Sequence, residues 1–299
     1  MRPARIISLV ALLVVVVGAG CSSSGSARGA PGVVKVVAAE NSWGDIARQI
    51  GGSHVEVTSI INDPSTDPHQ YESDARTAAE VADARLVIVN GLGYDDFVGK
   101  LLSNTSHPGR AVLTVAETLG VTGPDANPHL WYDLPKVAGV ARAIARALAA
   151  VDPADAAAFA ANVAPFANSL LPLNRLLATI KDEHLGAPVA YTERLPGYLL
   201  EVAGLHDATP SGFAQAIEDG NEPGAGATQA MNELITQHRI RVLLYNAQTT
   251  SAVTQQVQGL ARENGIPVVA VTETMPKSES SYQAWQQHQL EALVRALAR

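Results

Sequence analysis

Short runs rich in valine and isoleucine alternate along the chain with segments whose apolar residues recur every three or four positions. The runs predict buried strands, and the periodic segments between them predict helices that cover those strands. Strand and helix in alternation predict an α/β fold of parallel sheets with helices on both faces. The expected strands are residues 33–40, 55–61, 84–91 and 111–115, then, after a gap, 187–193, 240–246 and 266–273.

The gap between the two sets of strands carries a helical pattern over residues 152–184. It opens with an Asp-Pro pair typical of a helix start, and apolar residues then recur along one face. One helix of that length would run ~45 Å and could join two lobes. Because Pro165 and Pro172 each remove a backbone hydrogen bond, two helices with a break near Leu171 are the alternative.

Two α/β lobes are expected because the chain beyond residue 33 is longer than one hydrophobic core usually holds. The N-terminal lobe would span residues 33–151 and the C-terminal lobe residues 185–299, with residues 152–184 as the connecting helix. In open parallel sheets, ligands gather at the carboxyl ends of the strands. Polar residues at those ends are therefore the candidates for binding.

The first 20 residues have the pattern of an export signal. Two arginines precede an apolar stretch, interrupted only by Ser8, that is short for a membrane span, although an anchoring helix is the alternative. Cys21, the only cysteine, follows small residues and begins a tether over residues 21–32 that is rich in serine and glycine. This arrangement resembles the bacterial lipoprotein signal, with Gly18 where an aliphatic residue is usual. The resemblance implies a lipid anchor on Cys21 and an extracytoplasmic location at the cell membrane.

Removal of the first 20 residues lowers the number of basic residues from 21 to 19, against 29 acidic ones. The resulting net charge near -10 argues against nucleic acid as a partner and against a polybasic membrane patch. It is compatible with a cation as the ligand.

Two histidines and two glutamates fall where such a fold gathers ligands. His69 lies in the loop after the second expected strand, and His129 precedes a helix; Glu193 and Glu273 close two later strands. A proline precedes each histidine and stiffens its loop. Singly, such residues are usually surface or capping residues. Together they form a ligand set suited to a divalent transition metal.

The repeated patterns DPHQY and NPHLW resemble the metal-binding solute-binding proteins of bacterial ABC importers for zinc and manganese, the cluster 9 or A-I group. Further similarity lies in NGLGYDDFV, YTERLPGYLLEVAGL, NEP and VVAVTET, so the resemblance covers essentially residues 33–299. It implies two lobes joined by a long helix, a metal in the cleft between them and no catalysis. It also implies delivery of the metal to an ABC transporter permease, by a protein expected to be a monomer.

By this resemblance the metal ligands are His69, His129, Glu193 and Glu273. The third position is histidine in many zinc-binding members and glutamate in manganese-binding members, so Glu193 favours manganese or iron slightly over zinc. The fourth is normally aspartate, and Glu273 is one methylene longer. The loop before His129 also lacks the histidine-rich or acidic segment of many zinc-specific members.

Four residues flank the expected ligands and are predicted to support them, since metal-bound imidazoles usually donate to a carboxylate or carbonyl. They are Tyr71, Glu72, Trp131 and Asp133. Packing or helix capping is the alternative for each. A zinc-dependent metallohydrolase of the cell envelope is the alternative function, because the same ligand set could activate a water. Glu72 would be its base, but the sequence contains neither HExxH nor GxSxG.

Overall fold

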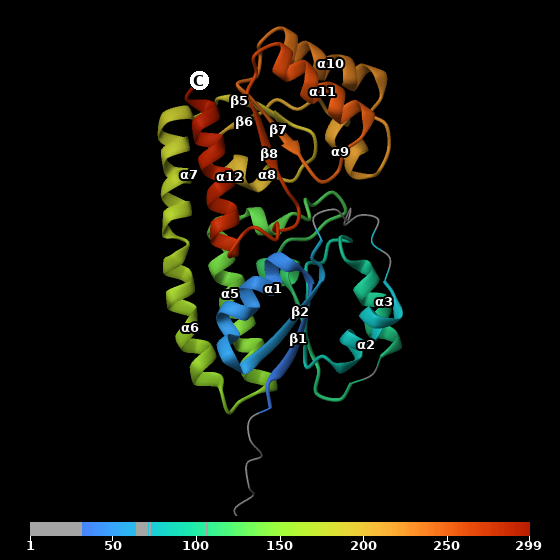
Figure 1. Ribbon diagram of the computed structural model, residues 1–299, viewed down its shortest axis with the longest axis vertical. Helices are drawn as coiled ribbons and strands as arrows, with labels where there is room; N and C mark the ends of the chain where they lie inside the picture. Colours follow the sequence, from blue (N-terminus) through green and yellow to red (C-terminus); the bar gives the residue numbers. More distant parts are fainter. Residues whose placement is uncertain (1–31, 64–70, 72, 106) are drawn as a thin grey trace, which may run out of the picture. The chain divides into compact units, whose positions relative to one another are not determined.

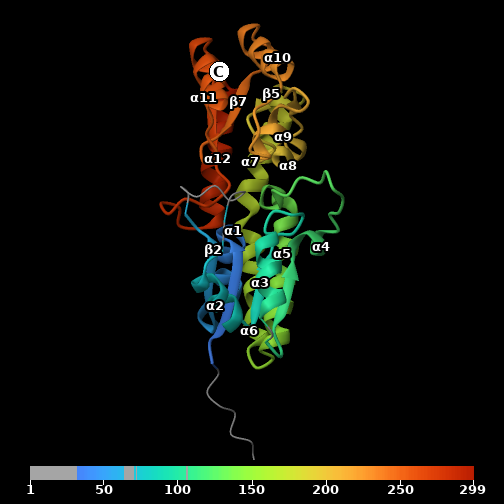
Figure 2. The same ribbon diagram turned by 90° about the vertical axis from the view of Figure 1, so that its right-hand side faces the viewer.

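The computed structural model describes residues 32–63, Tyr71, 73–105 and 107–299. Within these residues the strands form two sheets of four strands each. Every pairing between neighbouring strands is parallel. Helices lie on both faces of each sheet (Figures 1 and 2). The predicted fold class, α/β with two parallel sheets flanked by helices, is confirmed.

The N-terminal sheet is made of β1 (Val34–Glu40), β2 (Val55–Ile61), β3 (Leu86–Val89) and β4 (Ala111–Thr114). Its spatial order is β2-β1-β3-β4, with Val36 of β1 opposite Val57 on one side and Leu86 on the other. Because β1 is buried on both faces, its sequence is a nearly continuous apolar run rather than an alternating one.

Helices cover both faces of this sheet. On one face, α1 (Asn41–Gly51) and α5 (Leu134–Val151) share a hydrophobic core with Val34, Val36 and Ala38 of β1. On the other face, α2 (Ala75–Asp83) and α3 (Asp96–Asn104) pack over Val37 and Ala39. The remaining short elements are η1 (Gly52–His54), α4 (Val115–Leu119) and η3 (Leu130–Tyr132).

The helical segment between the sheets is bent rather than straight. It begins at Ala156 and divides at Leu170 into α6 (Ala156–Ser169) and α7 (Leu171–His184), which follow one another in Figure 1. Pro172 lies in the first turn of α7, where its missing N–H group has no helical partner to lose. The predicted connecting helix is therefore present as a long bent helix, and its bend at Leu170 lies next to the break considered near Leu171.

The C-terminal sheet repeats the architecture with β5 (Pro188–Tyr191), β6 (His206–Asp207), β7 (Val242–Asn246) and β8 (Val268–Val271), in the order β6-β5-β7-β8. One face packs against the last helix, α12 (Tyr282–Leu297), together with α7 and α8 (Gly197–Val202). The other face packs against α9 (Phe213–Glu218), α10 (Ala225–Thr236) and α11 (Ala252–Glu263). Strand β6 was not predicted, because two exposed residues carry no periodic pattern.

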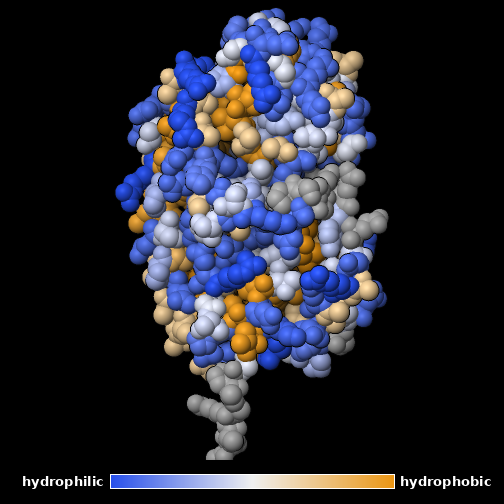
Figure 3. Space-filling model, in the orientation of Figure 1, coloured by the Kyte–Doolittle hydropathy of each residue, from blue (hydrophilic) through white to orange (hydrophobic). Residues whose placement is uncertain are grey.

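One hydrophobic core runs through both sheets. It joins side chains of β1, α5, α6, α7, β5, β7 and α12, so the two lobes are packed together where these elements meet. Polar residues cover most of the face seen in Figure 3, with smaller hydrophobic areas between them. This continuous packing holds the ends of β1, β5, β7 and β8 at one junction, which is where the candidate site lies.

Candidate metal centre

Several predicted residues lie outside the described part of the chain. These are Cys21, His69 and Glu72. The neighbouring Tyr71 is described, and its hydroxyl lies 3.0 Å from Thr77 Oγ1 in α2. Its ring is 4.7 Å from that of Phe97 in α3. The described contacts of Tyr71 are thus with these two helices of the N-terminal lobe.

The structure brings three of the four predicted ligands together. His129, Glu193 and Glu273 are all buried at the junction of the two lobes. His129 Nε2 lies 3.8 Å from Glu273 Oε2. Both glutamates lie two residues beyond their strands, because β5 ends at Tyr191 and β8 at Val271, slightly earlier than predicted. Their position after the strands gives the side chains room to turn toward the histidine.

The turn around His129 determines which ring nitrogen faces the carboxylate. Asn127 Oδ1 accepts from the His129 backbone N–H at 3.1 Å and lies 2.7 Å from Nδ1 of the ring. This oxygen only accepts, so Nδ1 carries the ring proton and Nε2 is the nitrogen directed at Glu273. Edge-on contacts with Tyr94 and Trp131, at ring-centroid distances of 5.7 and 5.4 Å, hold the imidazole plane.

Asn246, the last residue of β7, bridges the two carboxylates. Its Nδ2 donates to Glu193 Oε2 and to Glu273 Oε1, each at 2.8 Å. The side-chain amide is held in place because its oxygen accepts from Gln248 N at 3.0 Å. Sequence reasoning missed Asn246, although a polar residue that ends a buried apolar strand was an available signal.

Tyr94 is a second residue whose role the sequence did not reveal. Its hydroxyl donates to Glu273 Oε2 at 2.7 Å. Burial, and then the Glu273 carboxylate, raise the pKa of Tyr94 well above its ordinary value, so the group remains a donor at neutral pH. Thr249 Oγ1 adds a longer hydrogen bond of 3.3 Å to Glu273 Oε1. Glu273 is therefore fixed by Asn246, Tyr94 and Thr249.

Trp131 and Asp133 follow His129 in the chain and have different surroundings. Trp131 is fully buried beside the imidazole, and its backbone carbonyl accepts from the Tyr282 hydroxyl. Asp133 instead forms an ion pair with Lys136, with Oδ2 2.7 Å from Nζ. This hydrogen bond raises the pKa of Lys136. Trp131 therefore forms one wall of the candidate site, whereas Asp133 is paired with Lys136 at the start of α5.

A further acidic pair lies at the end of the N-terminal sheet and was not predicted. Glu40 ends β1 and is almost completely buried, as is Asp95 at the start of α3. The Asp95 carboxylate accepts from the backbone N–H groups of Asn90 and Gly91, at 2.6 and 2.9 Å. Burial, and then the charge of Asp95, raise the pKa of Glu40 well above its usual value.

The donor atoms of His129, Glu193 and Glu273 lie near one another but are not at the distances expected for ligands of a single metal ion. Two ligands ~2.1 Å from a shared tetrahedral metal are ~3.4 Å apart, slightly less than the 3.8 Å between His129 Nε2 and Glu273 Oε2. Within the described ranges, no three histidine, cysteine, aspartate or glutamate side chains converge closely enough to hold a metal ion. The amide of Asn246 and the hydroxyl of Tyr94 occupy carboxylate oxygens that a metal would take.

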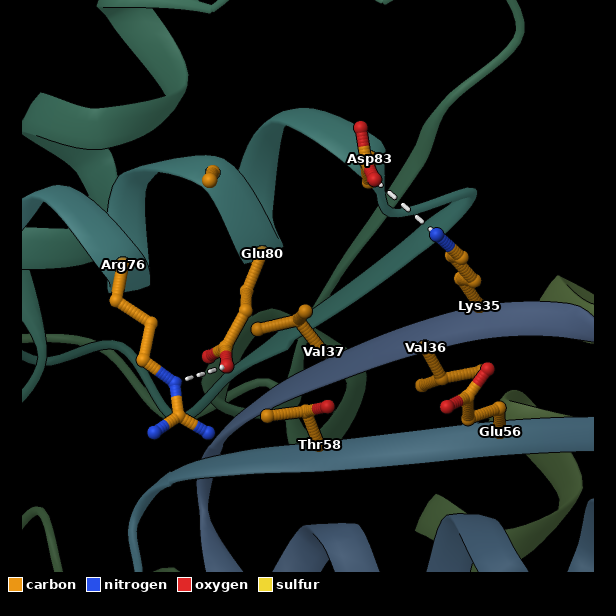
Figure 4. A pocket seen from close by; sticks show the side chains of 9 residues that line it. Lys35, Val36, Val37, Glu56, Thr58, Arg76, Glu80 and Asp83 are labelled. Atoms are coloured by element: carbon orange, nitrogen blue, oxygen red, sulfur yellow. Dashed lines mark hydrogen bonds and ion pairs between the residues drawn. The ribbon is translucent and has the colours of Figure 1, made fainter.

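A separate hollow on the N-terminal sheet does not have the chemistry of a metal site. It has a volume of about 390 Å³ and lies between α2 and strands β1 and β2. Four of its five charged side chains pair with one another, Lys35 with Asp83 at 3.1 Å and Arg76 with Glu80 at 3.0 Å (Figure 4). The described residues that line it include neither histidine nor cysteine. The buried site at the lobe junction is therefore the better candidate.

Comparison with known proteins is consistent with this geometry. The chain is 28% identical over 185 residues to the manganese-binding lipoprotein MntA of Halalkalibacterium halodurans, a match covering 59% of this chain and 61% of that relative. It is 25% identical over 284 residues to the metal ABC transporter substrate-binding lipoprotein FimA of Streptococcus parasanguinis, covering 89% and 88% of the two chains.

Among solved structures, the solute-binding protein FpvC of Pseudomonas aeruginosa in complex with Mn²⁺ has a similar fold. The TM-score is 0.74 at 21% identity, and the similarity covers 89% of this chain and 98% of that one. The family described as zinc-uptake complex component A, periplasmic (ZnuA) matches residues 36–296, nearly the whole described part of the chain. With two parallel α/β lobes, a bent connecting helix and a buried histidine–carboxylate junction, the chain belongs to the ZnuA family of metal-binding solute-binding proteins.

Proposed function

We propose that the protein captures a divalent transition metal outside the cytoplasmic membrane and delivers it to an ABC transporter permease. The observation that carries the proposal is the buried contact between His129 and Glu273, 3.8 Å apart, with Glu193 held beside them through Asn246. These side chains come from both lobes. A cation bound among them would therefore hold the lobes together, and lobe separation would release it.

His129, Glu193 and Glu273 supply one nitrogen donor and two carboxylates to the proposed metal site. We assign His69 as the second nitrogen donor on the basis of its DPHQY motif and of the family resemblance. Two imidazoles and two carboxylates suit manganese, iron(II) and zinc. Zinc would bind intrinsically more tightly than manganese at such a site, so selectivity for manganese needs further oxygen ligands or metal supply. Glu193 in place of histidine favours manganese.

We infer a transport role rather than catalysis. A hydrolytic metal centre needs an open coordination position for water and a route by which a substrate reaches it. His129, Glu193 and Glu273 are each at most 1% exposed. Such enclosure suits capture of a bare ion. It disfavours the alternative of a zinc-dependent metallohydrolase, whose proposed base, Glu72, lies outside the described residues.

The location we propose is the outer side of the cell membrane, with a lipid anchor on Cys21. The N-terminal signal and the tether of residues 21–32 support this, and two relatives are named as lipoproteins. A monomer tethered there could move between metal capture and its permease.

The test uses the mature protein, stripped of metal, and measures thermal unfolding with manganese, zinc or iron(II). A metal present at 100 times its dissociation constant should stabilise the native state by ~2.7 kcal/mol. His129→Ala should lose this stabilisation. The control is His288→Ala, because His288 is exposed and its Nδ1 lies 2.9 Å from Glu279 Oε1, in an ion pair that includes none of the ligand candidates. No shift with any of the three metals, or an equal shift in both variants, would overturn the proposal.

A further inference from the structure

Glu40 is a buried acidic residue that the proposed ligand set does not use. Its side chain is 1% exposed at the carboxyl end of β1. By geometry neither carboxyl oxygen forms a hydrogen bond with another described residue, and the side chain close enough to raise the pKa of Glu40 is a second acid, Asp95. Buried polar groups are nearly always hydrogen-bonded, and an unpaired one destabilises the fold. A carboxyl group retained in this state is a candidate for a ligand that the protein chain does not itself provide.

The alternation of β1 determines the direction of this side chain. Val34, Val36 and Ala38 face the core that contains Tyr94 and Trp131. Side chains two positions apart in a strand point to the same face, and the backbone of Glu40 is still extended. Glu40 therefore points to the side of the sheet on which Tyr94 and Trp131 enclose the imidazole of His129.

Two observations connect Glu40 with Glu273 in the other lobe. The next residue, Asn41, exchanges two hydrogen bonds with the backbone of Met275, at 2.8 and 2.9 Å, only two positions after Glu273. The Tyr94 hydroxyl donates to Glu273 Oε2 at 2.7 Å, and the Tyr94 side chain belongs to the same core as Val36 and Ala38 of β1. Tyr94 therefore connects Glu273 with the face of β1 to which Glu40 points.

The neighbouring acid, Asp95, differs from Glu40 because its carboxylate is held by hydrogen bonds within the protein. Both of its oxygens accept backbone N–H groups, from Asn90 and Gly91. Glu40 accepts no backbone N–H group of another described residue, and its side chain lies beside the acidic side chain of Asp95 instead. A divalent cation would compensate both the missing hydrogen bonds and the repulsion between the two acids.

We propose that Glu40 is an additional oxygen ligand of the metal centre and biases it toward manganese or iron(II) over zinc. The inference rests on the proposed function and extends it. Manganese and iron(II) accept five or six ligands and tolerate several oxygens, whereas zinc is usually satisfied by four donors with a preference for nitrogen and sulfur. A third carboxylate beside Glu193 and Glu273 would therefore favour the binding of manganese and iron(II), which take more ligands than zinc.

The test compares Glu40→Gln with Asp45→Asn in competition titrations of manganese and zinc against a chelator. Glu40→Gln keeps the side-chain volume and removes the anionic oxygens. Asp45→Asn removes one charge from the same helix start but keeps an acceptor for Tyr282 N, which Asp45 Oδ2 binds at 2.8 Å. We expect Glu40→Gln to weaken manganese binding by ~10-fold or more, as loss of a supporting ligand does, and zinc binding by much less.

The control should change the two affinities by the same small factor, so the manganese-to-zinc ratio is the decisive quantity. Cobalt(II) absorption supplies a second readout, because four-coordinate cobalt absorbs more intensely than five- or six-coordinate cobalt. Glu40→Gln should shift the spectrum toward the four-coordinate form. An unchanged ratio with an unchanged cobalt spectrum would overturn the role of Glu40. Failure of the unsubstituted protein to bind any metal would instead overturn the proposed function.

Discussion

Asn41 and Met275, 234 positions apart in the sequence, form a reciprocal pair of hydrogen bonds. Asn41 Nδ2 donates to the Met275 carbonyl at 2.8 Å, and Met275 N–H donates to Asn41 Oδ1 at 2.9 Å. The pair joins the start of α1 in the N-terminal lobe to the segment that follows Glu273 in the C-terminal lobe. It therefore links the lobes directly beside the proposed metal centre.

Substitution of Asn41 by alanine should loosen this link. Because the Met275 backbone groups lose both partners, we expect the free energy of unfolding to fall by ~1–3 kcal/mol. The rate of metal release should rise, as measured by stopped-flow transfer to a chelator. Asn162→Ala is the matched control, since Asn162 Nδ2 donates to the Ile50 carbonyl at 2.9 Å, away from Glu273. Equal release rates in the two variants would contradict a role for the Asn41–Met275 pair in retention.

Replacement of Asn246 by leucine removes the donor shared by Glu193 and Glu273. Two neighbouring carboxylates without that donor repel each other, and loss of a hydrogen bond to a charged group costs ~1.5–3 kcal/mol. Urea unfolding of the metal-free variant should show this loss, and saturating metal should reduce it because the cation replaces the amide. A stability difference unaffected by metal would show that Asn246 acts elsewhere. Asn264→Leu, at the end of α11, is the control.

Tyr94→Phe tests whether the hydroxyl positions Glu273. The variant keeps the ring against His129 and Trp131 but loses the 2.7 Å hydrogen bond to Glu273 Oε2. Loss of such a supporting contact typically lowers metal affinity by ~10–100-fold. Isothermal titration with manganese measures the effect. Unchanged affinity would mean that Asn246 and Thr249 suffice to hold the carboxylate.

The stability of the metal-free protein should depend on pH through Glu40. Burial, followed by the charge of Asp95, raises the pKa of Glu40 in the folded state above its ordinary value of 4.5. The folded state therefore binds more protons at this group than the unfolded state, so stability falls as pH rises from about 4.5 through the raised pKa. Denaturant unfolding of the unsubstituted protein and of Glu40→Gln across this range should give a flatter profile for the variant. Parallel profiles would contradict this assignment.

Glu193→His should raise the preference for zinc over manganese. Imidazole is a softer donor than carboxylate, and zinc favours nitrogen ligands more strongly than manganese does. The ratio of dissociation constants measured by competition with a chelator is the relevant quantity. A ratio equal to that of the unsubstituted protein would remove Glu193 as a determinant of metal choice.

The sequence by itself determined the fold class, because valine-rich runs buried on both faces and helical periodicity are local patterns. All seven expected strand runs correspond to strands, namely β1, β2, β3, β4, β5, β7 and β8. Pro172 also indicated where the connecting helix would break. Glu193 and Glu273 were candidates because each follows an apolar strand run, and the carboxyl ends of parallel strands meet at one edge. His129 was a candidate because of its place in the repeated Pro-His pattern.

Only the tertiary structure decided which groups surround those side chains. Asn246 reaches Glu273 across 27 positions and Tyr94 reaches it across 179, through contacts that depend on how the lobes pack. Glu40 is one polar residue at the end of an apolar run in the sequence, and only the packed core shows that its side chain is buried beside the acidic Asp95. The periodicity of apolar residues in the sequence indicates which face of a helix or strand is buried. It does not record which distant side chain lies opposite, because that depends on the packing of elements far apart in the chain.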